Sequence, residues 1–268
     1  MKGHIAIKAL LACSLMLVLV ACWATSGWAQ SAEDGRSAYF AGDFEHAFKA
    51  WEPVAKNGSS DAQYYLGILH FEGRGVLIDE VQAGEWFLKS ATQGHPMAAI
   101  ELGSLIENGV RIPGAKGKAE AWYQRAVEKL PEIEALAHKG DPFAQMTLGA
   151  MYGFPLGVEE DQEKALLWHR KAADQGFAQS QYHLGFMYDE GLGVDLNDVE
   201  AVRWYRLAAE QGFNWAQDLL GLMYEHGEGV DEDLEHAEYW YKQAAARSNV
   251  DAFNKLALLY LNQARYAE

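Results

Sequence analysis

The first clear pattern along the chain is a stripe of inward-facing positions with a helical period. Ala62, Leu66 and His70 lie four residues apart and fall on one side of a helix. The helix is predicted to end at Gly73, because glycine readily takes the left-handed conformation of a helix cap. A short Gly-Arg-Gly-Val connection follows, and Asp79 then stands where an N-cap residue would begin a second helix. This stretch therefore predicts two antiparallel helices.

The same helix pair recurs along the chain. One tryptophan per unit marks the second helix, with separations of 36, 46, 36 and 36 residues between Trp86, Trp122, Trp168, Trp204 and Trp240. A second marker in the first helix keeps the same period, at Leu66-Gly67, Leu102-Gly103, Leu148-Gly149, Leu184-Gly185 and Leu220-Gly221. A fixed period of this size is typical of a solenoid. A single pair cannot bury its own apolar stripe, so stacking on neighbouring pairs must stabilise it.

The repeated motif resembles the Sel1-like repeat, a relative of the tetratricopeptide repeat. It reads Ala-Gln-x-x-Leu-Gly-x-x-Tyr-x-x-Gly-x-Gly-Val, then Asp, Ala, Trp-Tyr, Ala-Ala and Gln-Gly, and Ala178 to Gly212 carries nearly all of it. The resemblance implies an all-α fold, a right-handed α-solenoid of antiparallel helix pairs. We expect a degenerate N-terminal helical unit over 30–60, Sel1-like repeats over 61–248 and a C-terminal capping helix over 251–268. The expected units are 61–96, 97–142 with an insertion, 143–178, 179–214 and 215–250.

The insertion interrupts the period between Trp122 and Trp168, which lie ten residues further apart than the other tryptophan pairs. It contains Pro131 and a second helical phrase, Glu132 to Lys139. We expect an irregular joint near residues 128–142 that changes the superhelical curvature.

The amino terminus has the pattern of an export signal. Lys2 and Lys8 precede an apolar run that is too short to span a bilayer comfortably. Two processing routes are open: a signal peptide over 1–29, or a lipoprotein signal over 1–21 that ends in Leu-Val-Ala and leaves Cys22 for lipidation. The sequence therefore predicts a periplasmic protein, or alternatively a membrane-anchored lipoprotein.

Charge limits the partners. The chain has 22 Lys and Arg against 38 Asp and Glu, a formal net charge of −16. We expect no nucleic acid partner, because phosphates would be repelled and no basic patch is evident. Membrane contact is expected only through a lipid anchor at Cys22.

A candidate binding row lies on the first helices, opposite the stripe that contains Leu66. In tetratricopeptide-like solenoids the first helices line the concave side, so the resemblance implies that this row is the floor of a groove. Apolar and acidic residues alternate in it: Tyr64, Phe71, Phe143, Met146, Tyr182, Phe186, Asp189, Trp215, Leu222 and Glu225. The row suits a protein or peptide with basic and apolar residues. Packing between first helices of adjacent units is the alternative role.

Catalytic and metal patterns are weak by comparison. No serine begins the Ser-x-x-Lys arrangement, no Gly-x-Ser-x-Gly occurs, and the nine histidines are scattered without His-Glu-x-x-His. We therefore expect no catalytic residue, metal or cofactor. The leading interpretation is an exported protein–protein interaction adaptor or regulator. One alternative is a lipoprotein scaffold of an envelope assembly. The other, suggested by Sel1-like proteins linked to β-lactams, is a β-lactam- or peptidoglycan-acting enzyme.

Overall fold

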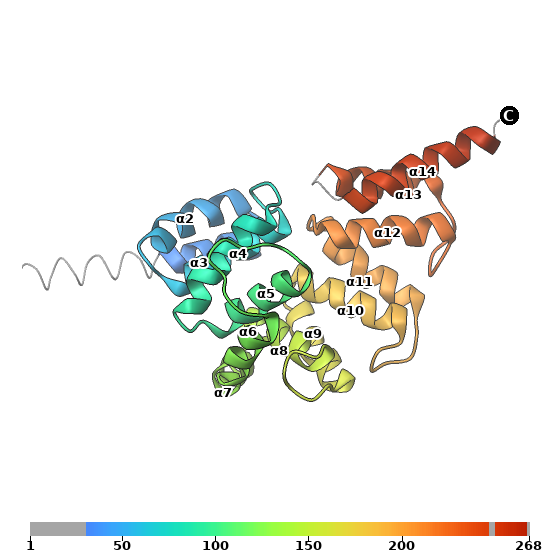
Figure 1. The fold of residues 1–268 in the computed structure, drawn as a ribbon. Coiled ribbons are helices and arrows are strands. Elements are labelled where there is room, and N and C mark those ends of the chain that lie inside the picture. Colours follow the sequence, from blue (N-terminus) through green and yellow to red (C-terminus); the bar gives the residue numbers. More distant parts are fainter. Residues whose placement is uncertain (1–30, 247–249, 267–268) are drawn as a thin grey trace, which may run out of the picture.

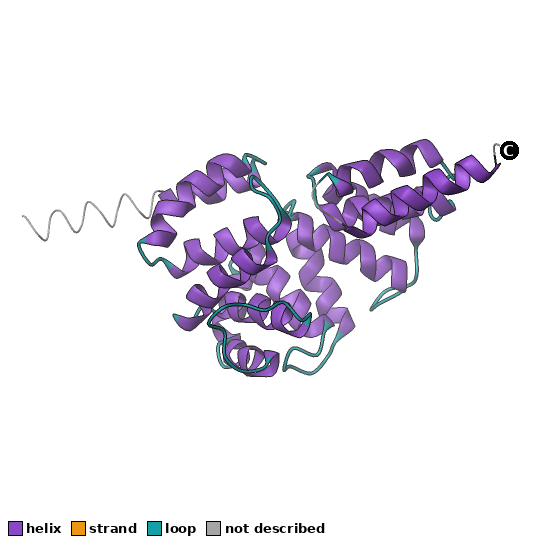
Figure 2. Cartoon of the chain, turned by 45° about the horizontal axis from the view of Figure 1, so that its top comes forward, coloured by secondary structure: helices purple, strands orange, loops and turns teal. Residues whose placement is uncertain are grey.

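The computed structural model describes residues 31–246 and 250–266, and within these ranges all regular secondary structure is helical (Figures 1 and 2). Residues 31–40 are helical and precede α2 (Phe44–Lys56). Five antiparallel pairs follow: α3 (Ser60–Glu72) with α4 (Glu80–Thr92), α5 (Pro96–Glu107) with α6 (Ala119–Val127), α8 (Pro142–Gly153) with α9 (Gln162–Ala173), α10 (Ala178–Glu190) with α11 (Asp198–Glu210), and α12 (Asn214–His226) with α13 (Leu234–Ala245). The predicted solenoid of antiparallel helix pairs is confirmed. In the described part of the chain, no helix has the length and apolar character needed to cross a bilayer.

The second helices begin where their N-cap residues predict. The side chains of Asp79, Asp161, Asn197 and Asp233 each accept a hydrogen bond from the backbone N–H three residues ahead. These bonds satisfy N–H groups that the first turn of a helix leaves without partners. The first helix of the first repeat ends at Gly73, which has the expected left-handed backbone with φ of 67°. Local sequence therefore sets the ends of these elements.

The glycine of each Leu-Gly pair lets the two helices of a unit touch. A Cβ added at Gly185 would lie 2.6 Å from the Tyr205 ring, and one at Gly221 would lie 2.7 Å from the Tyr241 ring. Any side chain at these positions would push the second helix away, so the glycine fixes the close packing within the pair.

The insertion forms a helix of its own. Helix α7 (Leu130–His138) lies between α6 and α8 and packs against α8. Pro131 stands in its first turn, where the missing N–H costs nothing. The change of superhelical curvature at this joint stays a prediction.

The amino-terminal half folds across its own concave side. Phe143 on α8 is fully buried, and its ring centroid lies 5.6 Å from that of Tyr39, 4.8 Å from that of Tyr65 and 4.8 Å from that of Phe177. One continuous core runs from Tyr39 to Phe177. In Figure 1 these helices gather into one group, and α12, α13 and α14 (Val250–Tyr266) extend away from it.

A buried charged cluster lies at the centre of this closure. Arg74, the middle residue of the first Gly-x-Gly connection, is only 1% exposed, and its Nε lies 3.4 Å from the carboxylate of the fully buried Glu72. The Tyr39 hydroxyl donates a hydrogen bond of 2.8 Å to the same carboxylate. The Arg74 guanidinium also lies over the rings of Phe44, at 4.8 Å, and Phe213, at 5.7 Å. A connecting loop of the first repeat thus reaches the last repeats.

Candidate partner-binding site

A pocket of about 470 Å³ opens on the concave side, between the first helices of all five repeats. It gathers four members of the predicted row, namely Phe71, Met146, Tyr182 and Trp215. The other lining residues are Ile100, Glu101, Ser104, Glu107, Asn108, Tyr123, Ala150, Phe154, Pro155, Leu156, Gln179, His183 and Phe213. Superhelical closure therefore brings together residues that are far apart in the sequence. The volume is within the range that suits a small ligand or an inserted side chain.

Two aromatic residues from opposite ends of the repeat array meet at the pocket. The ring centroids of Phe71 on α3 and Trp215 on α12 are 4.9 Å apart, and the rings are tilted by 51°. Trp215 also lies edge-on to Phe213 at 5.3 Å. Both Phe71 and Trp215 keep part of their surface accessible. The pair closes the gap between the first and last repeats without filling the pocket.

Other members of the row lie in the core. Tyr64 and Phe143 are both 0% exposed and do not line the pocket. Met146 is 1% exposed but does line it. Tyr64 packs against His95, with ring centroids 4.7 Å apart. Tyr64 and Phe143 are therefore part of the core, and a partner would touch them only after the closure opened.

The remaining members of the row lie outside the pocket on α10 and α12. Phe186 and Leu222 are half-buried. Asp189 accepts a hydrogen bond of 3.0 Å from the Tyr205 hydroxyl, and Glu225 accepts one of 2.7 Å from Tyr241. Burial raises the pKa of the Asp189 carboxyl, and the bond from Tyr205 partly offsets the rise. Both acids are therefore held by their own repeat.

The same bond occurs in the second repeat, where Tyr123 donates to Glu107 at 2.7 Å. In all three cases the acid lies 16 residues before the tyrosine. The other two repeats have neither an acid nor a phenol at these places: they hold Phe71 with Phe87 and Gly153 with His169. Sequence reasoning missed this pairing, although comparison of the five units reveals it.

Sequence reasoning also missed Glu101, which is 9% exposed and lines the pocket. Burial, with the nearby charge of Glu72 adding to it, raises the pKa of the Glu101 carboxyl to about 8. Other repeats have Tyr65, Thr147 and Leu219 at the equivalent position, so an acid there departs from the pattern. An acid at a position that is uncharged in the other repeats was the sequence signal that could have identified Glu101 as a site residue.

His183 occupies the equivalent position in the fourth repeat and also lines the pocket. Its ring stacks on His169 with centroids 4.7 Å apart. Desolvation lowers the pKa of His183 to about 4, so the ring is neutral at pH 7. The acids among the described lining residues are Glu101 and Glu107, and no lysine or arginine occurs among them. With His183 neutral, no positive charge offsets the acids in this lining.

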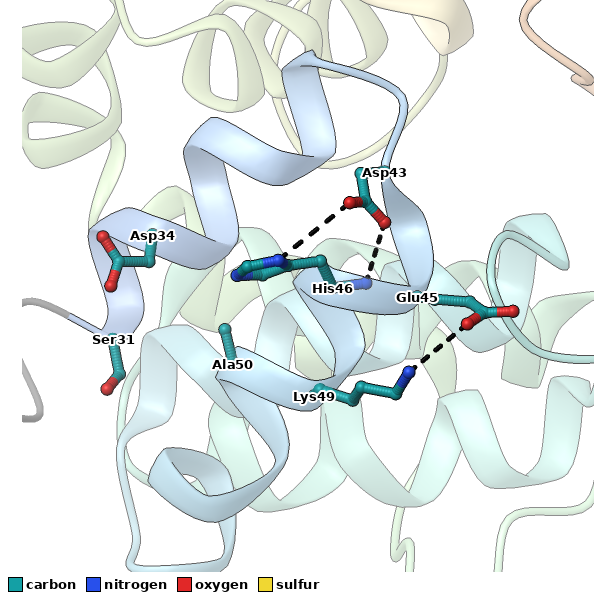
Figure 3. Close-up of a pocket in the computed structure, with 7 residues that line it drawn as sticks. All are labelled: Ser31, Asp34, Asp43, Glu45, His46, Lys49 and Ala50. Atoms are coloured by element: carbon teal, nitrogen blue, oxygen red, sulfur yellow. Dashed lines mark hydrogen bonds and ion pairs between the residues drawn. The ribbon is translucent and has the colours of Figure 1, made fainter.

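A second hollow lies near the amino terminus, between the helical residues 31–40 and α2, and has a volume of about 540 Å³ (Figure 3). The charged groups of α2 and its N-cap that line it make hydrogen bonds and ion pairs with one another. Asp43 accepts the backbone N–H of His46, and Lys49 pairs with Glu45 at 3.3 Å. These four side chains are exposed. Salt screens such groups, and the hollow lacks the apolar lining of the concave pocket.

The Sel1 repeat family matches the chain in five stretches: residues 60–95, 96–129, 142–177, 178–213 and 216–249. This chain belongs to the Sel1 repeat family. The gap at 130–141 includes α7. A Sel1 repeat protein from Oxalobacter formigenes has a similar solved structure, with 31% identity, a TM-score of 0.48, and coverage of 86% of this chain and 88% of that one.

Curated relatives share the repeats over shorter stretches. The chitin synthase regulator SKT5 of Malassezia restricta is 33% identical over 32% of this chain and 6% of its own length. An ERAD-associated E3 ubiquitin-protein ligase component, HRD3B of Arabidopsis thaliana, is 29% identical over 35% of this chain and 16% of its own length. This Sel1 repeat chain spans a third or less of the curated relatives it matches.

Two predicted features lie outside the described residues. They are the signal peptide over 1–29, with its alternative over 1–21, and the lipidation site at Cys22. Within the described part of the chain, no group of three or more His, Cys, Asp or Glu residues is arranged to hold a metal ion.

Proposed function

We propose that this Sel1 repeat chain is an exported protein–protein interaction adaptor or regulator, which binds a segment of its partner on the concave face of the solenoid. The observation that carries the proposal is the pocket to which α3, α5, α8, α10 and α12 all contribute. Aromatic groups surrounding a partly desolvated cavity are typical of the anchoring points of protein interfaces. The relatives named as a regulator and as a ligase component support a role in assemblies.

The binding face comprises the pocket and the adjoining half-buried positions of the row. Phe71, Tyr182 and Trp215 are accessible at the pocket, and Phe186 and Leu222 lie beside it on α10 and α12. Asp189 and Glu225 add negative charge at the ends of these helices. A partner segment with apolar and basic residues fits such a surface.

The test of binding uses a double variant with a matched control. Trp215→Ala with Phe186→Ala should weaken binding at least tenfold when the partner, first identified by crosslinking in cell envelopes, is titrated against purified protein. The control is Leu167→Ala with Leu207→Ala, which removes exposed apolar side chains from α9 and α11. Equal loss in both double variants, or loss in neither, would contradict a concave binding face.

Export is tested separately. The signal interpretation predicts that the chain accumulates in the periplasm with residues 1–29 removed, which fractionation and amino-terminal sequencing measure. Palmitate labelling that Cys22→Ser abolishes would instead establish the lipoprotein scaffold. Retention of the complete chain in the cytoplasm would refute both routes.

A further inference from the structure

The Glu101 carboxyl is an unusual group to bury at the concave pocket. Its side chain is nine-tenths buried and lines the pocket, and no described residue gives it a hydrogen bond or an ion pair. A buried carboxyl is normally satisfied by a donor, because leaving it without one costs stability. Arg74, the arginine buried within the same closure, is engaged by Glu72 and by aromatic rings. Glu101 therefore has an unused capacity to accept a charged donor.

The rest of the pocket adds to this capacity. Glu107 lines it as a second acid on the same helix, about one and two-thirds turns further along α5. Phe71 and Trp215 also line the pocket, and aromatic rings attract cations that lie over their faces within about 6 Å of the centroid. Negative charge and aromatic faces occur together, and no described lining residue supplies a compensating lysine or arginine.

We propose that this pocket receives one cationic side chain, an arginine or a lysine, from the bound partner. The cation pairs with Glu101, with the charge of Glu107 adding to the attraction, while its alkyl stem packs against the Phe71–Trp215 pair. Its positive charge offsets the two effects that hold Glu101 protonated, namely desolvation and the charge of Glu72. This proposal depends on the proposed function in one respect only, that the cationic side chain comes from the partner protein.

Several titratable groups surround Glu101 and bear on its response to pH. Glu72 and Tyr64 face it from α3, Tyr123 from α6, and Tyr182 and His183 from α10, while Glu107 lies on its own helix. Glu72 is the one whose charge adds to the rise in the pKa of Glu101. His183 is neutral above pH 6.5 because its pKa is lowered to about 4. Cation binding should therefore strengthen as Glu101 ionises above neutral pH.

The test measures the pocket without the partner. Isothermal titration of the full chain uses a blocked arginine, N-acetyl-arginine methylamide, with the blocked citrulline as an uncharged isostere. We expect the arginine compound to bind at least tenfold more tightly than the citrulline compound, and about tenfold more tightly at pH 9 than at pH 6.5. Glu101→Gln should lower the affinity at least tenfold and remove the pH dependence.

A matched control guards against a general charge effect. Glu228→Gln removes an exposed acid of the fifth repeat that lies outside both the pocket and the proposed binding face. It should leave the affinity unchanged. Equal binding of citrulline, stronger binding of a blocked phenylalanine, or an undiminished affinity in Glu101→Gln would each overturn the proposal. Because the partner-capture test uses Trp215 and Phe186, the adaptor function can survive such a result.

Discussion

The two halves of the solenoid are built from the same repeat but held together differently. In the amino-terminal half, a single core joins residues from Tyr39 to Phe177, and Arg36 pairs with Asp141 at 2.9 Å across the concave side. In the carboxy-terminal half, smaller separate clusters follow one another along α10 to α14, and each helix contacts mainly its neighbours in sequence. The second arrangement is that of an ordinary solenoid with nearest-neighbour stability. The first has additional long-range contacts.

One repeat position accounts for much of this contrast. The middle residue of the Gly-x-Gly connection is Arg74 in the first repeat but Leu192 and Glu228 in the fourth and fifth. Arg74 is buried among aromatic rings and Glu72, whereas Glu228 is exposed. The same loop backbone is thus an internal bridge at one end of the array and a solvated turn at the other.

The largest expected effect comes from removing that bridge. Arg74→Ala leaves Glu72 buried without its partner and should lower the free energy of unfolding by about 3–5 kcal/mol. Glu228→Ala, at the same repeat position, should change it by less than about 0.5 kcal/mol. Urea denaturation of both variants measures the difference. Similar small changes would mean that the closure contributes little to stability.

Trp204→Ala should cost about 3–5 kcal/mol as well, because the side chain is 3% exposed, but its effect should be more local. If stability in this half depends on nearest neighbours, α10 to α14 should lose hydrogen-exchange protection while the core from Tyr39 to Phe177 keeps it. Uniform loss of protection along the chain would show that the two halves unfold as one unit.

Between pH 6.5 and pH 8, Glu101 should set the pH dependence of stability. Its folded pKa is raised to about 8 from the ordinary 4.5, so the folded state holds a proton that the unfolded state has lost. The free energy of unfolding should therefore fall through this window as pH rises, by on the order of 1–2 kcal/mol. Chemical denaturation at both ends of the window should show this fall, and Glu101→Gln should flatten it. A fall of the same size in the variant would assign the effect to other groups.

Histidines govern the range below that window. The pKa values of His95 and His183 are lowered to about 4 from 6.5, mainly by desolvation. Between pH 6.5 and pH 4 these histidines are protonated in the unfolded state but stay neutral in the folded state. They therefore lower the free energy of unfolding as pH falls through this range. The unfolded histidines lose their last protons only above about pH 7.5, so below that pH they partly oppose the fall due to Glu101, and the comparison with Glu101→Gln is what isolates Glu101.

The smallest expected effect concerns the tyrosine–acid bonds of the regular repeats. Tyr205→Phe removes the donor to Asp189 and should cost about 1 kcal/mol. Tyr188→Phe, which changes a phenol on α10 that receives a bond from Arg170, serves as a comparison outside this pattern. Thermal melts of each tyrosine variant, alone and combined with Asp189→Asn, measure the coupling energy between that tyrosine and Asp189. Additive losses for Tyr205→Phe and Asp189→Asn would contradict a specific bond.

The periodic features were predictable from the sequence because they depend on local physics. Asp79 and Asn197 determine helix starts through bonds to their own first turns, and Gly73 determines an end through its backbone freedom. Trp204 is buried, as expected for the residue that fills the gap between two helices. Such interactions involve residues in one repeat or its neighbour, so the period alone reveals them.

The pocket and the closure depended on the tertiary structure. The pattern of one repeat placed Phe71, Phe143 and Trp215 in a single row, but it could not tell that Phe143 is fully buried while the other two meet at the pocket. That outcome depends on how tightly the superhelix turns, which sums small rotations over many helix pairs. The burial of Glu101 follows from the same closure. The sequence by itself determined the repeats and their helix boundaries. The accumulated curvature of the solenoid decided which concave residues meet, because contacts across the superhelix axis have no fixed spacing along the chain.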